Sequence, residues 1–277
     1  MSSSINRRHW LKQASLAALG FGIALDSLGG EDYLSRNLRT ILPEGRNPFG
    51  ELGSTPALVN LGSNENPYGI SPLAQKAIGD LIKEAHRYQY NIPHVQLFKQ
   101  QLADYYGVTK EHILLTPGSG EALNLLARQF AGGNLVTATP TFAILPNTAK
   151  KIGVTVKEIP LDQHKVHNLN GMLKAIDKDT AQVYICNPAN PTGTVLHPSE
   201  LKAFCEEASK KTVVTIDEAY IDFLDAPYNE SMLSLIKGGN KNIIVVRTFS
   251  KIHAMAGMRV GFVIADPTMI ARLNENY

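Results

Sequence analysis

The sequence predicts an α/β fold, a three-layer domain in which helices cover both faces of a mostly parallel sheet. Apolar runs rich in β-branched residues, at 134–138, 154–159, 181–186, 212–220 and 242–249, alternate with helical patterns, as in βαβ units. The 277 residues, 44% hydrophobic and 19% charged, are enough to form a full core. Because ligands bind at the carboxyl ends of parallel strands, we expect the functional residues at that edge of the sheet.

Charge and cysteine content exclude several classes of function. The net charge is +2 and no long basic run or basic-aromatic interleaving occurs in the sequence, so nucleic acid is not an expected partner. The two cysteines, Cys186 and Cys205, lack metal-like spacing and are too few for a disulfide scaffold. We expect packed, reduced thiols and no metal site, although a disulfide stays open if the chain is exported.

The N-terminal segment, residues 1–30, has the features of an export signal. Arg7 and Arg8 precede an uncharged apolar segment at 13–25, which is too short for a stable membrane span. The run from Arg7 to Lys12 resembles a twin-arginine signal, which indicates a periplasmic location. The alternative is an amphipathic helix of a cytoplasmic protein, and several small residues leave the cleavage point open. Residues 31–57 are predicted to be a linker or N-terminal arm, followed by one domain over 58–277.

Two helices are predicted after the polar loop at 60–69. Ser71 and Pro72 form a cap and first-turn pair for a helix through about residue 84, and apolar spacing predicts another over 94–106. The aromatic stretch 86–90 between them contains Tyr88. On the sequence alone this stretch is equally consistent with surface packing.

A glycine-containing turn links the apolar residues 112–116 to the next helix. In Gly118-Ser119-Gly120, free backbone N–H groups and the positive end of the helix dipole could bind a phosphate. The third glycine of a dinucleotide fingerprint is absent, and a plain strand-to-helix turn explains the motif as well.

Further polar and aromatic residues follow the predicted strands. Thr141-Phe142 comes after the strand at 134–138, where the phenylalanine could stack on a ring or pack in the core. A rigid turn at 187–193 contains Asn190 and precedes a helix over 198–210. Asp217 and Tyr220 end the next strand. A carboxylate there needs a cationic partner if buried, and could otherwise cap a helix or form a salt bridge.

The stretch from Thr248 to Gly261 carries a lysine that is suited to covalent chemistry. Lys251 follows the buried strand at 242–249, and desolvation at a strand end leaves a nucleophilic amine. Thr248, Ser250 and Arg259 supply hydroxyls and a cation for a phosphate, which together suggest pyridoxal phosphate. A solvated loop lysine is the alternative when the stretch is taken alone.

Six runs together resemble the fold-type I pyridoxal-phosphate aminotransferases of class I/II, most closely the histidinol-phosphate aminotransferase branch. They cover the chain from about Asn60 to its end, in the order and spacing of that family. The runs are Asn64-Glu-Asn-Pro-Tyr-Gly, Gly118-Ser-Gly-Glu, Pro140-Thr-Phe, Asn187-Pro-Ala-Asn-Pro-Thr-Gly, Asp217-Glu-Ala-Tyr, and Ser250-Lys with Gly257-Met-Arg-Val-Gly.

The resemblance implies a role for each matching residue. Lys251 forms the Schiff base and later moves the proton, Asp217 pairs with the pyridinium nitrogen, and Asn190 and Tyr220 hydrogen-bond the ring oxygen. Phe142 stacks on the ring, and the 64–69 loop, with Asn66 and Tyr68, lies over the substrate. The phosphate is held by Ser119, Gly120, Thr248, Ser250, Arg259 and Tyr88 of a second subunit, which implies a homodimer.

The implied reaction is transamination between an amino acid or related amine and a 2-oxo acid. A decarboxylase or lyase of the same fold, or a cofactor-binding protein without turnover, are the alternatives. Members of the family continue beyond the lysine motif, so we expect the C-terminal segment of the small domain, with its carboxylate-binding arginine, to be missing from this chain. Because histidine biosynthesis is cytoplasmic, an exported relative is expected to act on another amine.

Overall fold

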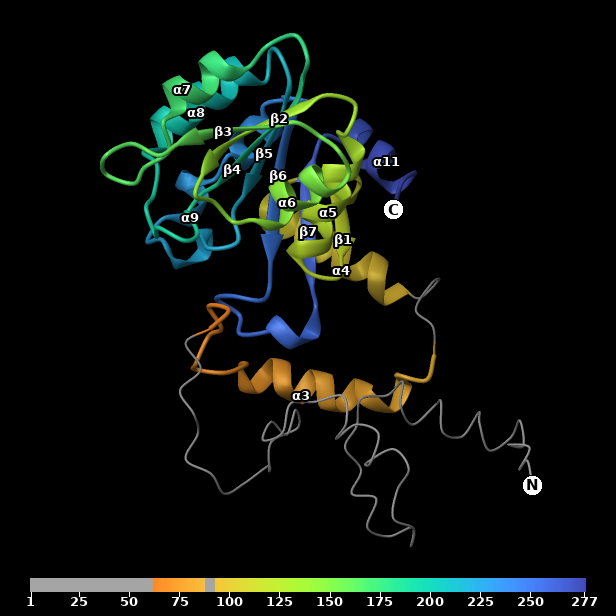
Figure 1. Ribbon diagram of the computed structural model, residues 1–277. Coiled ribbons are helices and arrows are strands. Elements are labelled where there is room, and N and C mark those ends of the chain that lie inside the picture. Colours follow the sequence, from red (N-terminus) through yellow and green to blue (C-terminus); the bar gives the residue numbers. More distant parts are fainter. Residues whose placement is uncertain (1–61, 88–92) are drawn as a thin grey trace, which may run out of the picture. The chain divides into compact units, whose positions relative to one another are not determined.

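The computed structural model describes residues 62–87 and 93–277, which contain a seven-stranded sheet (Figure 1). The predicted signal and arm, residues 1–30 and 31–57, lie outside the described residues. The strand order is β1-β7-β6-β5-β4-β2-β3; β7 runs antiparallel to its neighbours β1 and β6, and the other pairs are parallel. The strands are β1 (Ile113–Thr116), β2 (Asn134–Thr139), β3 (Val156–Pro160), β4 (Thr180–Cys186), β5 (Val213–Asp217), β6 (Ile243–Thr248) and β7 (Gly261–Ala265).

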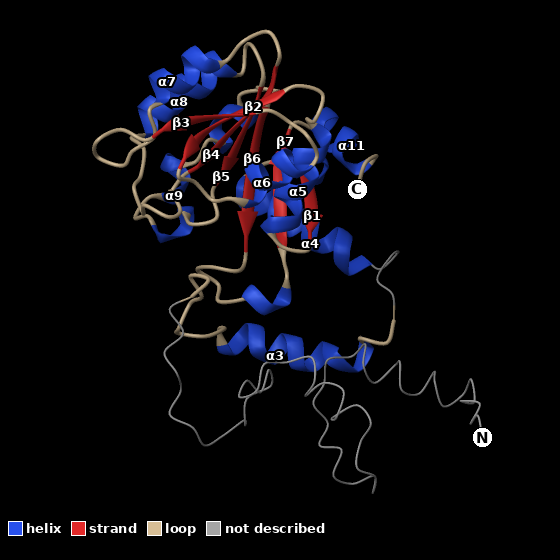
Figure 2. Ribbon diagram, viewed as in Figure 1, coloured by secondary structure: helices blue, strands red, loops and turns tan. Residues whose placement is uncertain are grey.

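Helices cover both faces of this sheet, as Figure 2 shows. The α-helices of the described residues are α3 (Pro72–Leu81), α4 (Pro93–Tyr106), α5 (Ser119–Gln129), α6 (Ile144–Lys151), α7 (Leu169–Ala175), α8 (Pro198–Ala208), α9 (Pro227–Glu230), α10 (Leu233–Lys237) and α11 (Pro267–Asn274). Short 3₁₀ turns are η2 (Ile82–Glu84), η3 (Lys110–His112), η4 (Ile221–Phe223) and η5 (Ala256–Met258).

Two apolar cores lie on the two faces of the sheet. On one face the strands pack against α4, α7, α8 and α10, with Leu102, Met172 and Phe204 in the core. On the other they pack against α5, α6 and α11, with Leu126, Leu145 and Leu273. Every residue of β6 and β7 is buried, because strands covered on both sides must be apolar almost throughout. The predicted three-layer α/β architecture is therefore confirmed.

Two predicted elements have different boundaries in the structure. The strand expected over 212–220 ends at Asp217, and Tyr220 instead precedes the 3₁₀ turn η4. The helix expected through residue 84 ends at Leu81 and continues as η2. Ser71 caps α3 as predicted, since its side chain accepts a hydrogen bond from the Ala74 N–H.

Both cysteines are free and buried, which confirms packed thiols. Within the described ranges, no helix combines the length and the apolar run needed to cross a bilayer.

Candidate active site

The candidate site lies where β4, β5 and β6 end side by side. In the register of this parallel set, Cys186 pairs with Asp217 and Asp217 pairs with Val246. The loops that follow the three strands carry Asn190, Tyr220 and Lys251. The fold thereby gathers residues that are far apart in the sequence, as the sequence predicted.

Asp217 is a buried carboxylate without a cationic partner. Its side chain is 1% exposed and accepts hydrogen bonds from the Tyr184 hydroxyl (3.1 Å, on Oδ2) and the Ala219 N–H (3.1 Å, on Oδ1). Burial raises the pKa of Asp217 to about 6, against the lowering effect of these two bonds. None of the ion pairs among the described residues involves Asp217. Neither the predicted salt bridge nor a helix cap explains its position.

Lys251 lies beside this carboxylate in a partly desolvated position. Its Nζ donates hydrogen bonds to the carbonyl oxygens of Ser63 (2.7 Å) and Asn64 (3.2 Å), and lies 5.5 Å from the centroid of the Tyr220 ring. Burial lowers the pKa of Lys251, which favours the neutral, nucleophilic amine. This environment differs from that of a solvated loop lysine.

Tyr220 is the hydrogen-bonding centre of the site. Its hydroxyl oxygen accepts hydrogen bonds from the amides of Asn64 (2.9 Å) and Asn190 (3.3 Å). Burial raises the pKa of Tyr220, so the hydroxyl stays protonated at neutral pH and can donate to an acceptor in the site.

The predicted phosphate site lies at the N-terminus of α5. Gly118 is the residue before the helix, with a φ of 81°, and a Cβ built there would lie 2.2 Å from a guanidinium nitrogen of Arg259. Gly261 in β7 also packs closely against this turn, since a Cβ added at Gly261 would lie 2.4 Å from the Ser119 backbone nitrogen. Glycine at both positions therefore lets the Arg259 guanidinium and the free N–H groups of the helix terminus lie together, which suits an anion.

Arg259 is held in place by backbone carbonyls. Its guanidinium donates to Ala256 O at 2.9 Å and Pro117 O at 3.4 Å, and its backbone has a left-handed φ of 54°. The hydroxyls of Thr248 and Ser250 are 2.9 Å apart, and Thr248 Oγ1 also accepts the Ser250 N–H. The sequence predicted Thr248, Ser250 and Arg259 as one group; Thr248 is the last residue of β6, and Ser250 and Arg259 lie in the segment that joins β6 to β7.

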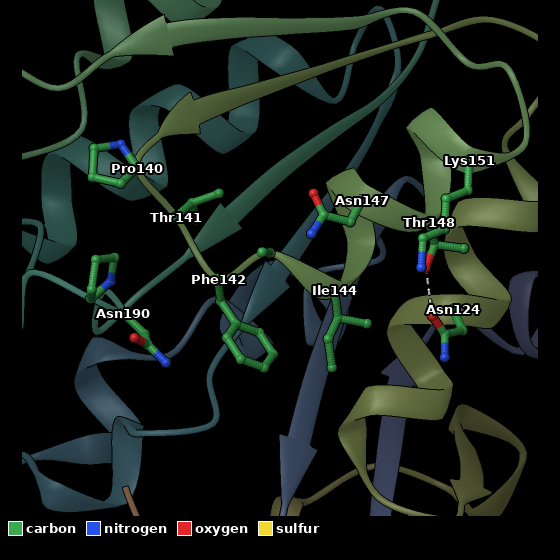
Figure 3. Close-up of a pocket in the computed structure, with 11 residues that line it drawn as sticks. Asn124, Pro140, Thr141, Phe142, Ile144, Asn147, Thr148, Lys151 and Asn190 are labelled. Atoms are coloured by element: carbon green, nitrogen blue, oxygen red, sulfur yellow. Dashed lines mark hydrogen bonds between the residues drawn. The ribbon is translucent and has the colours of Figure 1, made fainter. Parts of the chain in front are cut away.

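Phe142 lies in the loop after β2, on the wall of a cavity of about 570 Å³ (Figure 3). Asn190 lines the same cavity, together with Asn124 of α5 and Thr148 of α6, which share a hydrogen bond of 2.7 Å. Phe142 is partly exposed rather than fully buried, so its ring is available to a ligand.

Three predicted residues are not part of this cluster. The Asn66 amide donates to the carbonyl oxygens of Lys251 and Ile252, so it contacts the lysine loop through the backbone. The Tyr68 side chain is 94% exposed, and Tyr88 lies outside the described residues. Roles for Asn66, Tyr68 and Tyr88 in binding substrate or phosphate stay predictions.

The sequence reasoning missed Tyr184, which binds Asp217. It named Asn64 and Gly118 within the substrate loop and the phosphate motif, but did not predict that Asn64 binds Tyr220 or that Gly118 makes room for Arg259. Strand periodicity places Tyr184 on the same face of β4 as Cys186, but its contact with Asp217 also depends on the register of β4 with β5, in which Tyr184 pairs with Thr215. The contacts of Asn64 and Gly118 depend on tertiary structure and leave no local signal.

The chemistry of this cluster fits pyridoxal 5'-phosphate. An unpaired buried carboxylate suits a protonated ring nitrogen, and a hydroxyl with an amide beside it suits a ring oxygen. A desolvated amine suits an aldehyde, and a helix terminus with an arginine suits a phosphate. The fold and the site thus define an α/β domain built to hold an anionic, aldehyde-bearing cofactor.

The chain belongs to the aminotransferase class I and II family, whose model matches residues 56–276. Histidinol-phosphate aminotransferase from Listeria welshimeri is 39% identical over 226 residues, which are 81% of this chain and 61% of that protein. The structure of histidinol-phosphate aminotransferase from Sinorhizobium meliloti in complex with pyridoxal-5'-phosphate has a TM-score of 0.71 at 26% identity, covering 77% of this chain and 58% of that one.

The fold is shared with proteins of other activities. L-threonine-O-3-phosphate decarboxylase from Porphyromonas gingivalis has a TM-score of 0.63 at 23% identity, over 74% of this chain and 62% of that one. This likeness shows the fold alone. The chain spans 61% of the length of the Listeria relative.

Proposed function

We propose that this chain is the cofactor-binding part of a pyridoxal-phosphate-dependent aminotransferase of the histidinol-phosphate type. The observation that supports this most is Asp217, a buried carboxylate that forms no ion pair among the described residues and lies near the partly desolvated amine of Lys251. A buried carboxylate is costly without a cation. A cofactor with a protonated ring nitrogen would supply that cation.

Each residue of the site has a distinct task in this proposal. Bound pyridoxal phosphate would serve as the electron sink that lets a substrate amine lose its α-proton. Lys251 would hold the cofactor through its amine, and the same amine, once free, could take and return the α-proton as general base and acid. Asp217 would pair with a protonated ring nitrogen, and Tyr220 with Asn190 would hydrogen-bond the ring oxygen.

The remaining residues fix the cofactor's position. The N–H groups of Ser119 and Gly120, the hydroxyls of Thr248 and Ser250, and the Arg259 guanidinium bind the phosphate. Phe142 would stack on the ring. Attachment at this many points would hold the cofactor rigidly beside Lys251.

The substrates we propose are an amino donor and a 2-oxo acid acceptor. The relatives from Listeria welshimeri and Sinorhizobium meliloti are histidinol-phosphate aminotransferases, which makes histidinol phosphate the first donor to test. We further propose a homodimer in which Tyr88 reaches the neighbouring site, and export through the segment around Arg7 and Arg8. Export would separate the chain from cytoplasmic histidine biosynthesis and favour another amine.

The test begins with cofactor attachment. The purified full chain, mixed with pyridoxal phosphate and reduced with borohydride, is expected to carry the cofactor on the peptide that contains Lys251, as read by mass spectrometry. Lys251→Ala should lose the label, whereas Lys210→Ala, which changes an exposed lysine at the end of α8, should keep it. Equal labelling of the wild type and Lys251→Ala would refute the assignment.

Product analysis separates the possible reactions. With histidinol phosphate and other amines plus 2-oxoglutarate, an aminotransferase yields glutamate and a keto product, whereas a decarboxylase releases carbon dioxide. Cofactor attachment with neither product would mean that this chain binds the cofactor without turnover.

A further inference from the structure

Tyr184 is a fully buried tyrosine whose hydroxyl points at the carboxylate of the site. It stands in β4, has 0% of its surface exposed, and donates a hydrogen bond of 3.1 Å to Oδ2 of Asp217. No other side chain of the described residues hydrogen-bonds Asp217. A polar hydroxyl in the middle of a core strand is costly to bury without a partner, and here the partner is the carboxylate itself.

The two oxygens of Asp217 are each held by one donor from the protein. Tyr184 holds Oδ2 from β4, and the Ala219 N–H holds Oδ1 from the turn after β5. A carboxylate has about four lone-pair sites, so two donors fix its plane and leave acceptor capacity for a cation. Ala219 restrains only the local turn, whereas Tyr184 joins the carboxylate to the neighbouring strand.

We propose that Tyr184 is a positioning residue for Asp217. The Tyr184 hydroxyl keeps the Asp217 carboxylate ionised and oriented toward the cofactor's ring nitrogen. This inference rests on the proposed function and goes beyond it, because it gives Tyr184 a role that acts through Asp217. Its effect is transmitted through the hydrogen bond to Oδ2.

The electrostatic surroundings of Asp217 explain why this donor matters. Burial and the neighbouring Glu218 raise the pKa of Asp217, and the Ala219 N–H, the Tyr184 hydroxyl and the charge of Lys251 lower it. Cys186 and Tyr220, which also face Asp217, have raised pKa values and stay neutral near pH 7. The pKa of Tyr184 is itself raised well above its usual value by burial, so its hydroxyl remains a donor at any working pH.

The experiment measures the pyridoxal phosphate dissociation constant of the full chain from pH 5 to 9. In Tyr184→Phe the packing is kept and the donor is lost, so the midpoint of the acid loss of affinity should move up by roughly one pH unit. Affinity should fall about threefold near pH 6.5 and approach a tenfold loss at pH 5, yet lie within about twofold of the wild type at pH 9, where Asp217 is ionised in both proteins.

Thr137→Val provides a matched control. The Thr137 hydroxyl, also buried, donates a hydrogen bond of 3.0 Å to the carbonyl oxygen of Tyr184, so the variant loses a buried bond in the same region without touching Asp217. Its affinity midpoint should stay at the wild-type pH. A midpoint that moves equally in both variants, or a uniform loss of affinity across the pH range in Tyr184→Phe, would overturn the proposal.

A second substitution guards against a variant that does not fold. Site-specific 3-fluorotyrosine at position 184 makes the hydroxyl a stronger donor, and should move the midpoint to lower pH. An unmoved or raised midpoint in that protein contradicts the inference. Failure of the wild type itself to bind the cofactor through Lys251 would instead refute the proposed function, so the two failures are distinguishable.

Discussion

At the residue scale, two adjacent carboxylates have opposite environments. Glu218 accepts hydrogen bonds from Arg247, Ser231 and the Met232 N–H, and is fully satisfied by the protein. Asp217, one residue earlier, faces the other side of β5 and has only uncharged donors. Since both are 1% exposed, burial alone does not distinguish them. The ion pairs do: Glu218 is paired with Arg247, whereas Asp217 forms no ion pair among the described residues, which supports our proposal that it binds the cofactor.

The first prediction concerns the stability of the cofactor-free protein. Burial raises the pKa of Asp217 from 3.8 to about 6, so the ionised form is disfavoured in the folded state. The resulting penalty is absent below pH 4, grows as the pH rises, and reaches about 3 kcal/mol above pH 6. Asp217→Asn should therefore raise the free energy of unfolding by up to ~3 kcal/mol at pH 8 and change it little at pH 4. Urea unfolding at both pH values measures this.

The exposed Asp179→Asn is the control for this prediction, and should show the same small effect at both pH values. Asp217→Asn should at the same time weaken cofactor binding. A stability gain of equal size at pH 4 and pH 8 would show that ionisation is not the cause.

A second prediction concerns His167, a buried residue outside the site. Its Nε2 has no hydrogen-bond partner among the described residues, and burial lowers its pKa from 6.5 to about 4. The folded state thus prefers neutral His167. The stability that this preference contributes is full above pH 6.5 and falls by about 3 kcal/mol as the pH drops to 4.

His167→Leu should flatten this acid loss, whereas the exposed His164→Gln should leave it unchanged. Urea midpoints at pH 7.5 and 4.5 provide the comparison. Between pH 4 and 6, His167 makes the free energy of unfolding rise with pH, whereas Asp217 makes it fall. A variant that removes one of the two residues should therefore show the pH dependence that the other contributes. A His167→Leu protein that loses as much stability in acid as the wild type would contradict this account.

These residues also show what a sequence can and cannot predict about a site. Lys251, Asp217 and Asn190 were predicted because each lies at or shortly after the end of a recognisable strand, where the strand ends of a parallel sheet meet, and because each matches a family motif. Tyr184 was not predicted, because a tyrosine inside an apolar run looks like a core residue. Its role depends on the pairing of β4 with β5, which is a tertiary fact.

At the element scale, a buried ion pair ties β6 to the end of β5. The Arg247 guanidinium lies 2.8 Å from Glu218 and 3.2 Å from Asp222, and 5.2 Å from the centroid of the Tyr106 ring. Arg247 directly precedes Thr248, and Glu218 directly follows Asp217. The ion pair therefore fixes the two strand ends that carry Asp217 and Thr248, the residue whose hydroxyl is predicted to bind the phosphate.

Removal of this cation should be severely destabilising. Arg247→Met leaves Glu218 buried without a cation, and the free energy of unfolding should fall by about 3–5 kcal/mol. The exposed pair of Arg128 and Glu121 gives the control, since Arg128→Met should change stability by less than about 1 kcal/mol. Denaturant titration at pH 7.5 measures both variants.

A double variant tests the mechanism of this loss. Adding Glu218→Gln to Arg247→Met removes the unpaired charge and should restore part of the stability. If the effects of Arg247→Met and Glu218→Gln on the free energy of unfolding simply add in the double variant, the loss in Arg247→Met does not come from the unpaired charge of Glu218.

Element boundaries illustrate the limits of prediction at this scale. The strands were predicted well because β-branched runs covered on both faces are continuous in the sequence. The strand predicted to reach Tyr220 stops at Asp217, because after Asp217 the chain turns, with Ala219 N–H bonded to Asp217 Oδ1. Side chain to backbone bonds of this kind compete with strand pairing, and periodicity does not detect them.

At the scale of the whole molecule, the site depends on contacts across nearly the entire described chain. The Lys251 amine donates hydrogen bonds to the backbone carbonyls of Ser63 and Asn64, and the Asn66 amide donates one to the carbonyl of Lys251. The fold class followed from the alternation of strands and helices. The connection of the 62–66 loop to the lysine loop could not be derived from that alternation, because nothing local specifies it.

Uneven packing along the chain gives the last prediction. The helix α3 has no buried residue, and Leu73 and Leu81 are exposed on it. A short helix that buries no apolar face is marginally stable, so its local opening should cost far less than global unfolding. Among the lysines and arginines of the described residues, trypsin should therefore cut first after Lys76, Lys83 and Arg87, and leave the remainder from residue 93 onward resistant. Lys210 and Lys211 are equally accessible lysines, yet they follow α8, whose Leu201 and Phe204 are buried in the core. Mass spectrometry of a time course gives the cleavage rate at each bond. Cleavage after Lys210 or Lys211 as fast as after Lys76 would show that α3 is held as firmly as the sheet, and that its apolar side chains are covered in solution.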